Sequence, residues 1–131
     1  MKTLIVEDDF TCRLILQKLL ETYGECHLAT NGKEALQAFN QARREEKPYH
    51  LLCLDIMMPD MDGQKVLREI RRIEQESGIL LGKGAKVIMI TALSDKDNVL
   101  EAFRQACDGY LVKPIEREKL TGLLRTFKLI K

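Results

Sequence analysis

The sequence is poor in the features that would point to several large functional classes. It has no tryptophan, three prolines, 5% aromatic residues and no apolar run that approaches the length of a membrane span. Neither sign of charge dominates, because 21 lysines and arginines accompany 20 aspartates and glutamates, for a net charge of +1. Overall charge therefore does not draw the chain to nucleic acid or to an acidic membrane. The sequence also lacks the basic helix-turn-helix segment of a DNA-binding domain, so neither direct nucleic-acid binding nor membrane insertion is expected.

Cysteine is present, but not in the pattern of a metal site. Cys12, Cys26, Cys53 and Cys107 form no C-x-x-C pair, so a zinc site built from paired cysteines is not expected. Three of them lie in apolar or helical stretches, where cysteine acts as a small hydrophobic residue. We interpret all four as reduced thiols of a cytoplasmic protein. Acidic residues follow the short apolar run at the start of the chain at once, which argues against a signal peptide.

Short apolar runs alternate with helical patterns along the whole chain. A length of 131 residues suits one domain with one core, which we place at residues 1–131. Continuous apolar runs are typical of strands buried on both faces of a parallel sheet. They lie at residues 4–6, 26–29, 51–54, 87–90 and 110–112. Apolar stripes at helical spacing follow them, at residues 16–23, 35–42, 66–73, 99–106 and 120–127.

Five strands and five helices in alternation predict an α/β domain with right-handed crossovers. Polar residues that favour helix N-termini agree with this pattern: Asn31, Asp62, and either Ser94 or Asp95, each stand before one of the helices. Open sheets of this type bind their ligands beyond the carboxyl ends of the strands. The residues that end or follow each strand are therefore the candidates for function.

Reactive side chains end or follow four of the five predicted strands. Glu7 and Asp8 come after the first and Asp55 after the third, while Thr91 and Lys113 come after the fourth and fifth. Clustered carboxylates repel one another unless a proton or a cation lies between them, and Mg²⁺ prefers oxygen ligands of this kind. A carboxylate can also act as a nucleophile, and an amine and a hydroxyl can neutralise the oxygens of a transferring phosphoryl group. The pattern favours Mg²⁺-dependent phosphoryl chemistry at this edge of the sheet.

Four stretches, each at the end of a predicted strand, carry a resemblance to a known family. They are Ile5 to Phe10, Leu54 to Gly63, Ile90 to Ala92 and Tyr110 to Pro114. Together and in this order, they resemble the receiver domain of bacterial two-component response regulators, of the stand-alone chemotaxis type. The resemblance implies a flavodoxin-like, doubly wound fold, with a five-stranded parallel sheet in the order 2-1-3-4-5 and helices on both faces. We expect a stand-alone receiver rather than a piece excised from a larger protein.

The resemblance also implies roles for the acidic residues. Asp55 matches the phosphoacceptor. Glu7 and Asp8 match the acidic pair that holds Mg²⁺, with Asp8 as the direct ligand and Glu7 acting through water. Asp55 itself and the backbone carbonyl of Met57 are implied to complete the metal site. Asp9 lies one place past the matching pair, and a surface or helix-capping role is expected for it.

The remaining matches concern the phosphoryl group and the change of shape that it causes. Thr91 and Lys113 match the hydroxyl and the amine that bind phosphoryl oxygens, and the bond between Lys113 and Pro114 is expected to be cis. Tyr110 matches the aromatic side chain that turns inward as Thr91 moves. This switch would alter the surface around the fourth helix, the fifth strand and the fifth helix.

The implied function is a phosphoacceptor signalling module and not an enzyme, although it would assist its own phosphorylation and dephosphorylation. Its partners would be a sensor histidine kinase or a histidine phosphotransfer protein, and an unknown downstream effector protein. One alternative is a phosphohydrolase with an aspartate nucleophile, but that family has a second aspartate two places later, where this sequence has Met57. Another alternative is an interaction domain that is never phosphorylated, against which the complete set of site residues argues.

Two segments need a local interpretation. Asp60 and Asp62 lie in the loop after the phosphoacceptor candidate, where a turn and a helix cap explain them without a metal. The connection from Ser77 to Lys86 is longer than is usual in the family. Its apolar trio, Ile79 to Leu81, is expected to pack against the domain in preference to contacting a partner.

Overall fold

The structure, a computed structural model, describes residues 1–58, 60–92, 102 and 106–131. Five parallel strands form one sheet in the order β2-β1-β3-β4-β5, which confirms the predicted topology. The strands are β1 (Lys2–Val6), β2 (Glu25–Ala29), β3 (Leu51–Asp55), β4 (Lys86–Thr91) and β5 (Gly109–Val112). Because every pairing is parallel, the carboxyl ends of all five strands lie along one edge of the sheet, the carboxyl rim.

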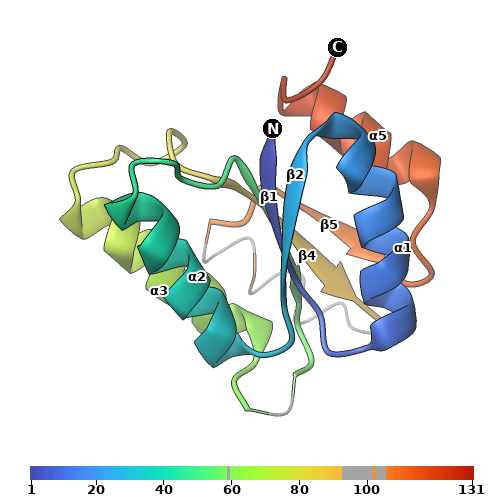
Figure 1. Ribbon diagram of the computed structural model, residues 1–131, viewed down its shortest axis with the longest axis horizontal. Helices are drawn as coiled ribbons and strands as arrows, with labels where there is room; N and C mark the ends of the chain where they lie inside the picture. The colour runs from blue at the N-terminus through green and yellow to red at the C-terminus, as the bar shows by residue number, and fades with distance from the viewer. Residues whose placement is uncertain (59, 93–101, 103–105) are drawn as a thin grey trace.

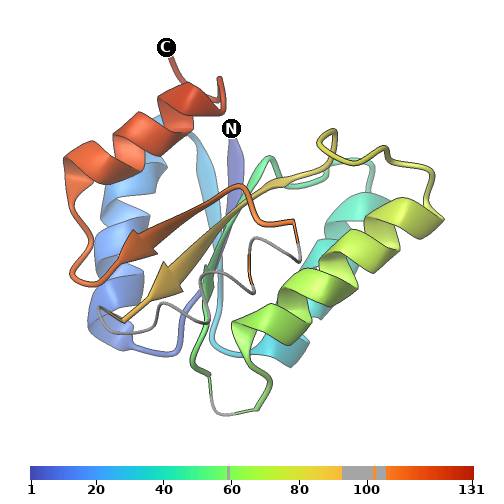
Figure 2. The ribbon, with the colours of Figure 1, turned by 180° about the vertical axis from the view of Figure 1, so that it is seen from behind.

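Helices cover both faces of the sheet (Figures 1 and 2). One face carries α1 (Phe10–Leu20), which continues into the 3-10 turn η1 (Glu21–Tyr23), together with α5 (Arg117–Thr126). The other face carries α2 (Gly32–Arg44) and α3 (Gly63–Glu76). The helix expected at residues 99–106, with its cap at Ser94 or Asp95, falls largely outside the described residues. Within the described ranges, every helix is too short or too polar to span a bilayer.

Two hydrophobic layers, one on each face of the sheet, make up the core. In β3, Leu52 and Leu54 pack on the side of α2 and α3, whereas Leu51 and Cys53 pack on the side of α1 and α5. All four side chains are fully buried. Burial on both faces explains why the central strands appear in the sequence as continuous apolar runs and not as alternating ones.

Short polar side chains cap three of the helices. The side chains of Asn31 and Asp62 each accept a hydrogen bond from the backbone N–H three residues later, at 2.8 Å and 3.0 Å. Asp9 accepts one from the backbone N–H of Thr11 at 3.4 Å. These bonds satisfy N–H groups that have no partner inside the helix. The predicted caps at positions 31 and 62 and the capping role expected for Asp9 are therefore confirmed.

Asp60 does more than form the expected turn. Its carboxylate oxygens accept hydrogen bonds from the backbone N–H groups of Gly32 at 3.2 Å and Lys33 at 3.4 Å. The side chain thus joins the loop after β3 to the first turn of α2, where the helix dipole favours a negative charge. This role is not visible in the sequence, because the partner Gly32 lies 28 residues away.

The expected packing of the loop between α3 and β4 is wrong for two of its three apolar residues. Leu80 is 73% exposed and Leu81 is 84% exposed. Gly78 and Gly82 lie on either side of them and adopt positive φ angles of 81° and 84°, which turn the loop outward. Glu74 fixes the base of the loop, since its carboxylate accepts a 2.8 Å hydrogen bond from the N–H of Ala85. The tip is consequently held away from the core.

Candidate functional site

The ladder of the sheet brings the predicted site residues to neighbouring positions on the carboxyl rim. Asp55 ends β3 and is paired with Ile90, one residue before Thr91 at the end of β4. Lys113 follows β5, and its N–H donates to the carbonyl of Thr91 at 2.9 Å. Glu7 follows β1, which lies beside β3 on the other side. Residues from four parts of the sequence therefore converge because parallel strands end together.

Three carboxylates form the centre of this site. Glu7, Asp8 and Asp55 each present an oxygen within 4.8 Å of the others. Glu7 is fully buried and Asp55 is 3% exposed, whereas Asp8 is exposed. The ammonium of Lys113 lies 3.1 Å from Glu7 Oε1 and 3.5 Å from Asp55 Oδ2. The site thus combines buried negative charge with one cation and one opening toward solvent.

Backbone and side-chain donors orient these carboxylates. The N–H of Met57 donates to Asp55 Oδ1 at 3.2 Å, and the N–H of Asp9 donates to Glu7 Oε2 at 3.2 Å. Glu7 Oε1 is buried and receives no hydrogen bond from the described residues, beyond its ion pair with Lys113. A buried carboxylate oxygen with spare acceptor capacity, beside two further carboxylates, is the donor set that a hard divalent cation prefers. A cation of this kind fits the residues present.

The protonation of the cluster follows from its crowding. Burial, followed by the neighbouring Glu7 carboxylate, raises the pKa of Asp55 to about 8. Burial alone would raise the pKa of Glu7, but hydrogen bonding with Asp55, Cys12, the N–H of Asp9 and Lys113 together outweighs burial, and the pKa is lowered. Burial acts against the ammonium of Lys113, yet contact with Glu7 and the charge of Asp55 raise its pKa. Crowding therefore favours the ionised forms of Glu7 and Lys113 and the protonated form of Asp55 near neutral pH.

The other predicted residues differ in how closely they join this cluster. Thr91 is buried, and its hydroxyl donates to the carbonyl of Ala92 at 3.3 Å. Met57 is 65% exposed beside the cluster, and Tyr110 is 44% exposed on β5. The peptide bond between Lys113 and Pro114 is cis, which confirms that expectation.

Two residues of α1 support the site and were missed in the sequence. Arg13 donates from Nη1 to the carbonyl of Glu7 at 2.9 Å, which fixes the chain between β1 and the helix. Cys12 is buried, and burial followed by the nearby Glu7 raises the pKa of its thiol to about 12. The thiol is thus a neutral neighbour of the carboxylates. Cys12 and Arg13 both lie in the first turn of the helix that follows the acidic pair. That position in the sequence is the signal that could have identified them.

Gly63 keeps the backbone of Asp55 in place, and Gly63→Ala is expected to destabilise the protein by about 2 kcal/mol. A β-carbon at this position would overlap the carbonyl oxygen of Asp55 and lie 3.0 Å from the α-carbon of Ile56, and neither backbone atom can yield without moving the site. Urea unfolding followed by circular dichroism measures the loss. Gly122→Ala is the control: it lies within α5 with open space around it, so a gain of about 0.5–1 kcal/mol is expected there. Equal stabilities of the two variants would contradict the prediction.

Comparison with known proteins gives a consistent set of relatives. The regulatory protein VanRB of Enterococcus faecalis is 34% identical over 126 residues, which cover 93% of this chain and 51% of that protein. The osmosensing histidine protein kinase SLN1 of Saccharomyces cerevisiae is 30% identical over 129 residues, which cover 97% of this chain and 10% of that protein. The chain thus spans about half the length of one relative and a tenth of the other.

Solved structures and a family model agree with these relatives. A response regulator receiver domain protein from Clostridium thermocellum superimposes with a TM-score of 0.80 at 26% identity, over 96% of this chain and 92% of that one. The family model of the response regulator receiver domain matches residues 3–125. On the strength of this match and of the strand order, the chain belongs to the response regulator receiver domain family.

Proposed function

We propose that residues 1–131 form a single receiver domain that accepts a phosphoryl group on Asp55. The observation that carries this proposal is the position of the Asp55 carboxylate: it is buried, clustered with Glu7 and Asp8, and 3.5 Å from the ammonium of Lys113. Such an arrangement offers a nucleophile, a cation site and a fixed positive charge within one pocket of the rim. The family membership supports the same function.

Mg²⁺ is the cation that suits this set of oxygens. The carboxylates of Asp8 and Asp55 and the backbone carbonyl of Met57 would hold it, with Glu7 acting through water. When bound, Mg²⁺ supplies positive charge against the phosphoryl oxygens and favours the ionised form of Asp55. This last effect matters because the pKa of Asp55 is raised to about 8 by burial and by Glu7.

In the transfer itself, an oxygen of the Asp55 carboxylate forms the new bond to phosphorus while the bond from phosphorus to the partner's histidine nitrogen breaks. The electron pair of that bond stays with the imidazole, which takes up a proton. Lys113 holds its ammonium against the transferring oxygens, and the hydroxyl of Thr91 donates to one of them. The donor is the phosphohistidine of a sensor histidine kinase or of a histidine phosphotransfer protein.

The response of the domain is a shift between two states of the rim. Thr91 moves toward the phosphoryl group, and Tyr110, which is 44% exposed here, turns inward. The surface around the fourth helix, β5 and α5 then changes shape and binds a downstream effector protein. The chain acts as a signalling protein of the cytoplasm and not as an enzyme; its four free cysteines agree with a reducing compartment.

A phosphohydrolase that uses an aspartate nucleophile is the weaker candidate. Such an enzyme needs a second carboxylate two residues after the nucleophile to act as an acid and a base, and Met57 occupies that position here. The N–H of Met57 is already directed at Asp55 Oδ1, at 3.2 Å. Within this geometry, Asp55 can accept a phosphoryl group but has no neighbouring acid at that place to turn substrate over.

Incubation with acetyl phosphate and Mg²⁺, followed by intact-mass measurement, tests the proposal. The protein should gain a single phosphoryl group, and a chelator should prevent the gain. Reduction with borohydride converts an acyl phosphate to an alcohol, so peptide mapping should then find the modified residue at position 55. Repeated hydrolysis of the donor without a gain in mass would favour the phosphohydrolase, and a label elsewhere would exclude Asp55 as the acceptor.

Asp8→Asn is expected to weaken Mg²⁺ binding by at least about tenfold, because a cation site loses one of three negative charges. Asp8 is the exposed member of the carboxylate cluster, so its removal leaves the buried residues packed as they are. Isothermal titration calorimetry at constant ionic strength measures the affinity. Asp9→Asn provides the control, since Asp9 caps α1 and an asparagine cap serves equally well. Equal losses in both variants would show that charge near the rim, and not ligation, sets the affinity.

A further inference from the structure

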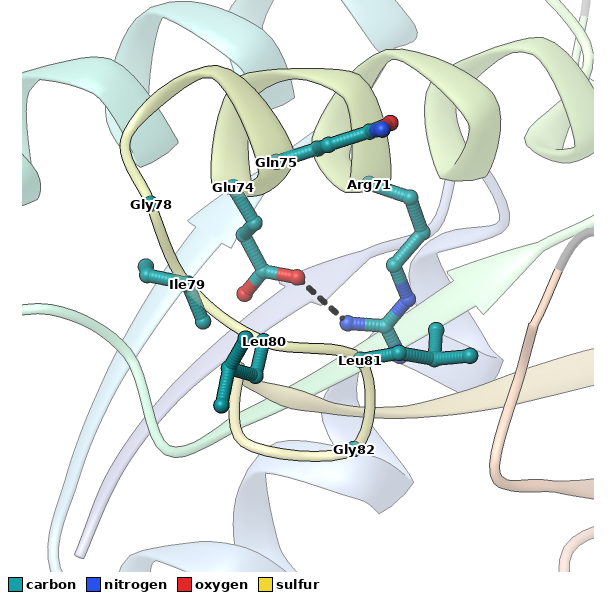
Figure 3. Close-up of a pocket in the computed structure, with 8 residues that line it drawn as sticks. All are labelled: Arg71, Glu74, Gln75, Gly78, Ile79, Leu80, Leu81 and Gly82. Atoms are coloured by element: carbon teal, nitrogen blue, oxygen red, sulfur yellow. Dashed lines mark hydrogen bonds and ion pairs between the residues drawn. The ribbon is translucent and has the colours of Figure 1, made fainter.

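Three hollows adjoin one another around the loop between α3 and β4. The largest, of about 440 Å³, lies between the end of α3 and the loop (Figure 3). A second hollow, of about 240 Å³, shares Glu74 with the first. A third, of about 140 Å³, shares Leu81 with the first and Lys86 with the second. We call this continuous surface the α3–β4 face; it is formed by Arg43, Glu74, Leu80, Leu81, Lys83 and Lys86.

Two leucines stand at the centre of the α3–β4 face. Figure 3 shows the side chains of Leu80 and Leu81 projecting from the loop beside the largest hollow. At 73% and 84%, they are the most exposed large apolar side chains among the described residues. Removal of such side chains from water favours association, and contiguous exposed apolar surface marks contact sites. Two neighbouring leucines at the tip of a loop are therefore suited to contact another molecule.

The charge around the leucines is positive. The hollows are lined by four lysine and arginine side chains but by only two carboxylates. Both carboxylates are already bound by Arg71, which contacts Glu74 at 2.7 Å and Asp108 at 2.9 Å. Lys83 forms no ion pair with any described residue. Within the described part of the chain, the guanidinium of Arg43 forms no ion pair and donates to the carbonyl of Ile73 at 3.4 Å.

This charge decides which kind of partner fits. A second copy of the chain would bring Arg43 and Lys83 against the same cations of its neighbour, and such like charges repel. A segment with acidic side chains beside its apolar ones would satisfy the cations and cover the leucines together. The α3–β4 face also lies at the start of β4, with Lys86, whereas the carboxyl rim lies at its end, with Thr91. A partner could therefore bind while the rim stays open.

We propose that the α3–β4 face is a docking site for an acidic, leucine-bearing helix of a partner protein. The apolar side chains of that helix enter the hollows on either side of Leu80 and Leu81, and its carboxylates contact Lys83 and Arg43. This site lies at the start of β4, whereas phosphorylation would act at the carboxyl rim, where β4 and β5 end. It gives the domain a second point of attachment whose occupancy does not require the phosphoryl group.

A synthetic amphipathic helix of about 14 residues, with leucines at every third or fourth position and glutamates elsewhere, serves as the probe. Titrated into the ¹⁵N-labelled full chain, it should shift the amide resonances of residues 74–86, with a Kd of about 100 µM or tighter. The double variant Leu80→Ser, Leu81→Ser and the single variant Lys83→Glu should each weaken binding by at least about tenfold. Leu28→Ser, which changes a 44% exposed leucine on β2, is the matched control and should leave binding unchanged.

Several outcomes would overturn the docking site. They are the absence of shifts at a probe concentration of about 1 mM, shifts centred on residues outside the α3–β4 face, and equal binding of a probe in which lysines replace the glutamates. Concentration-dependent dimerisation in sedimentation, abolished by Leu80→Ser and Leu81→Ser, would assign the surface to a second copy instead. The side chains of Leu80, Leu81 and Lys83 are exposed, so their substitution should leave the fold intact. Circular dichroism of each variant checks that a loss of binding does not reflect unfolding.

Discussion

Asp55→Asn is expected to abolish phosphoryl uptake and, at the same time, to stabilise the fold. The amide cannot form the acyl phosphate, so no gain in mass should remain. It also removes a group that the folded state holds next to Glu7, where burial and the carboxylate of Glu7 raise the pKa of Asp55 to about 8. An amide has no proton to hold against its ordinary pKa, so Asp55→Asn should raise the free energy of unfolding by about 2 kcal/mol at pH 8.

The pH dependence gives the sign of this effect. Asp55 has an ordinary pKa of 3.8 and a pKa of about 8 in the folded protein. Between these values the folded state holds a proton that the unfolded state has released, so the free energy of unfolding falls as the pH rises from about 5 to about 8. The lowered pKa of Glu7 changes the free energy of unfolding only near and below pH 4.5, the ordinary pKa of a glutamate. That range lies outside this window. Asp55→Asn should therefore flatten the slope between pH 5 and pH 8.

Urea unfolding at several pH values, with and without Mg²⁺, measures this slope. Mg²⁺ should flatten it in the parent protein, because a cation beside Asp55 favours the carboxylate. Asp62→Asn is the matched control, since it removes one negative charge from the adjacent loop and keeps a side chain that caps α3. An unchanged slope in Asp55→Asn would mean that the carboxyl of Asp55 is not the group that titrates.

The sheet and the rim could be predicted because their signals are local. A strand buried on both faces needs a continuous apolar run, and β1, β3 and β4 each have one. Parallel strands end together, so residues that follow such runs meet at one edge even when they are distant in sequence. Asp55 and Lys113 are 58 residues apart, yet this rule places them side by side.

The loop between α3 and β4 could not be predicted in the same way. An apolar trio in a sequence usually packs, and the apolar pattern alone does not distinguish Leu80 and Leu81 from core residues. Their exposure depends on the backbone, because Gly78 and Gly82 adopt positive φ angles and direct the tip outward. It also depends on Glu74, which holds the base of the loop through the N–H of Ala85. Neither the φ angles of the two glycines nor the bond between Glu74 and Ala85 has a signature in the apolar pattern.

Arg71 is a second residue whose role is invisible in the sequence, where it resembles an ordinary charged residue of an amphipathic helix. In the structure its guanidinium is largely buried and forms four hydrogen bonds. Nη1 donates to Glu74 at 2.7 Å and to the carbonyl of Ala85 at 2.8 Å. Nε donates to the carbonyl of Ala106 at 2.9 Å, and Nη2 to Asp108 at 2.9 Å. One side chain thus joins α3 to the start of β4 and to the segment that enters β5.

Arg71→Met is expected to destabilise the protein by about 3 kcal/mol. Methionine restores the apolar part of the side chain but leaves the carboxylate of Glu74, which is 7% exposed, and two backbone carbonyls without their donor. Urea unfolding at pH 7 measures the loss, and the slope of the free energy against urea should stay the same, since the unfolded chain exposes a similar surface.

The neighbouring arginine is the control for this prediction. Arg72 forms ion pairs with Glu69 and Glu76 on the exposed face of α3, and its side chain is 52% exposed. Because water already solvates these charges, Arg72→Met should cost less than about 1 kcal/mol. The two substitutions remove the same charge from adjacent positions of one helix, so the difference between them isolates what burial and hydrogen bonding add. If both variants lost equal stability, the helix surface charge, and not the network around Arg71, would be the stabilising feature.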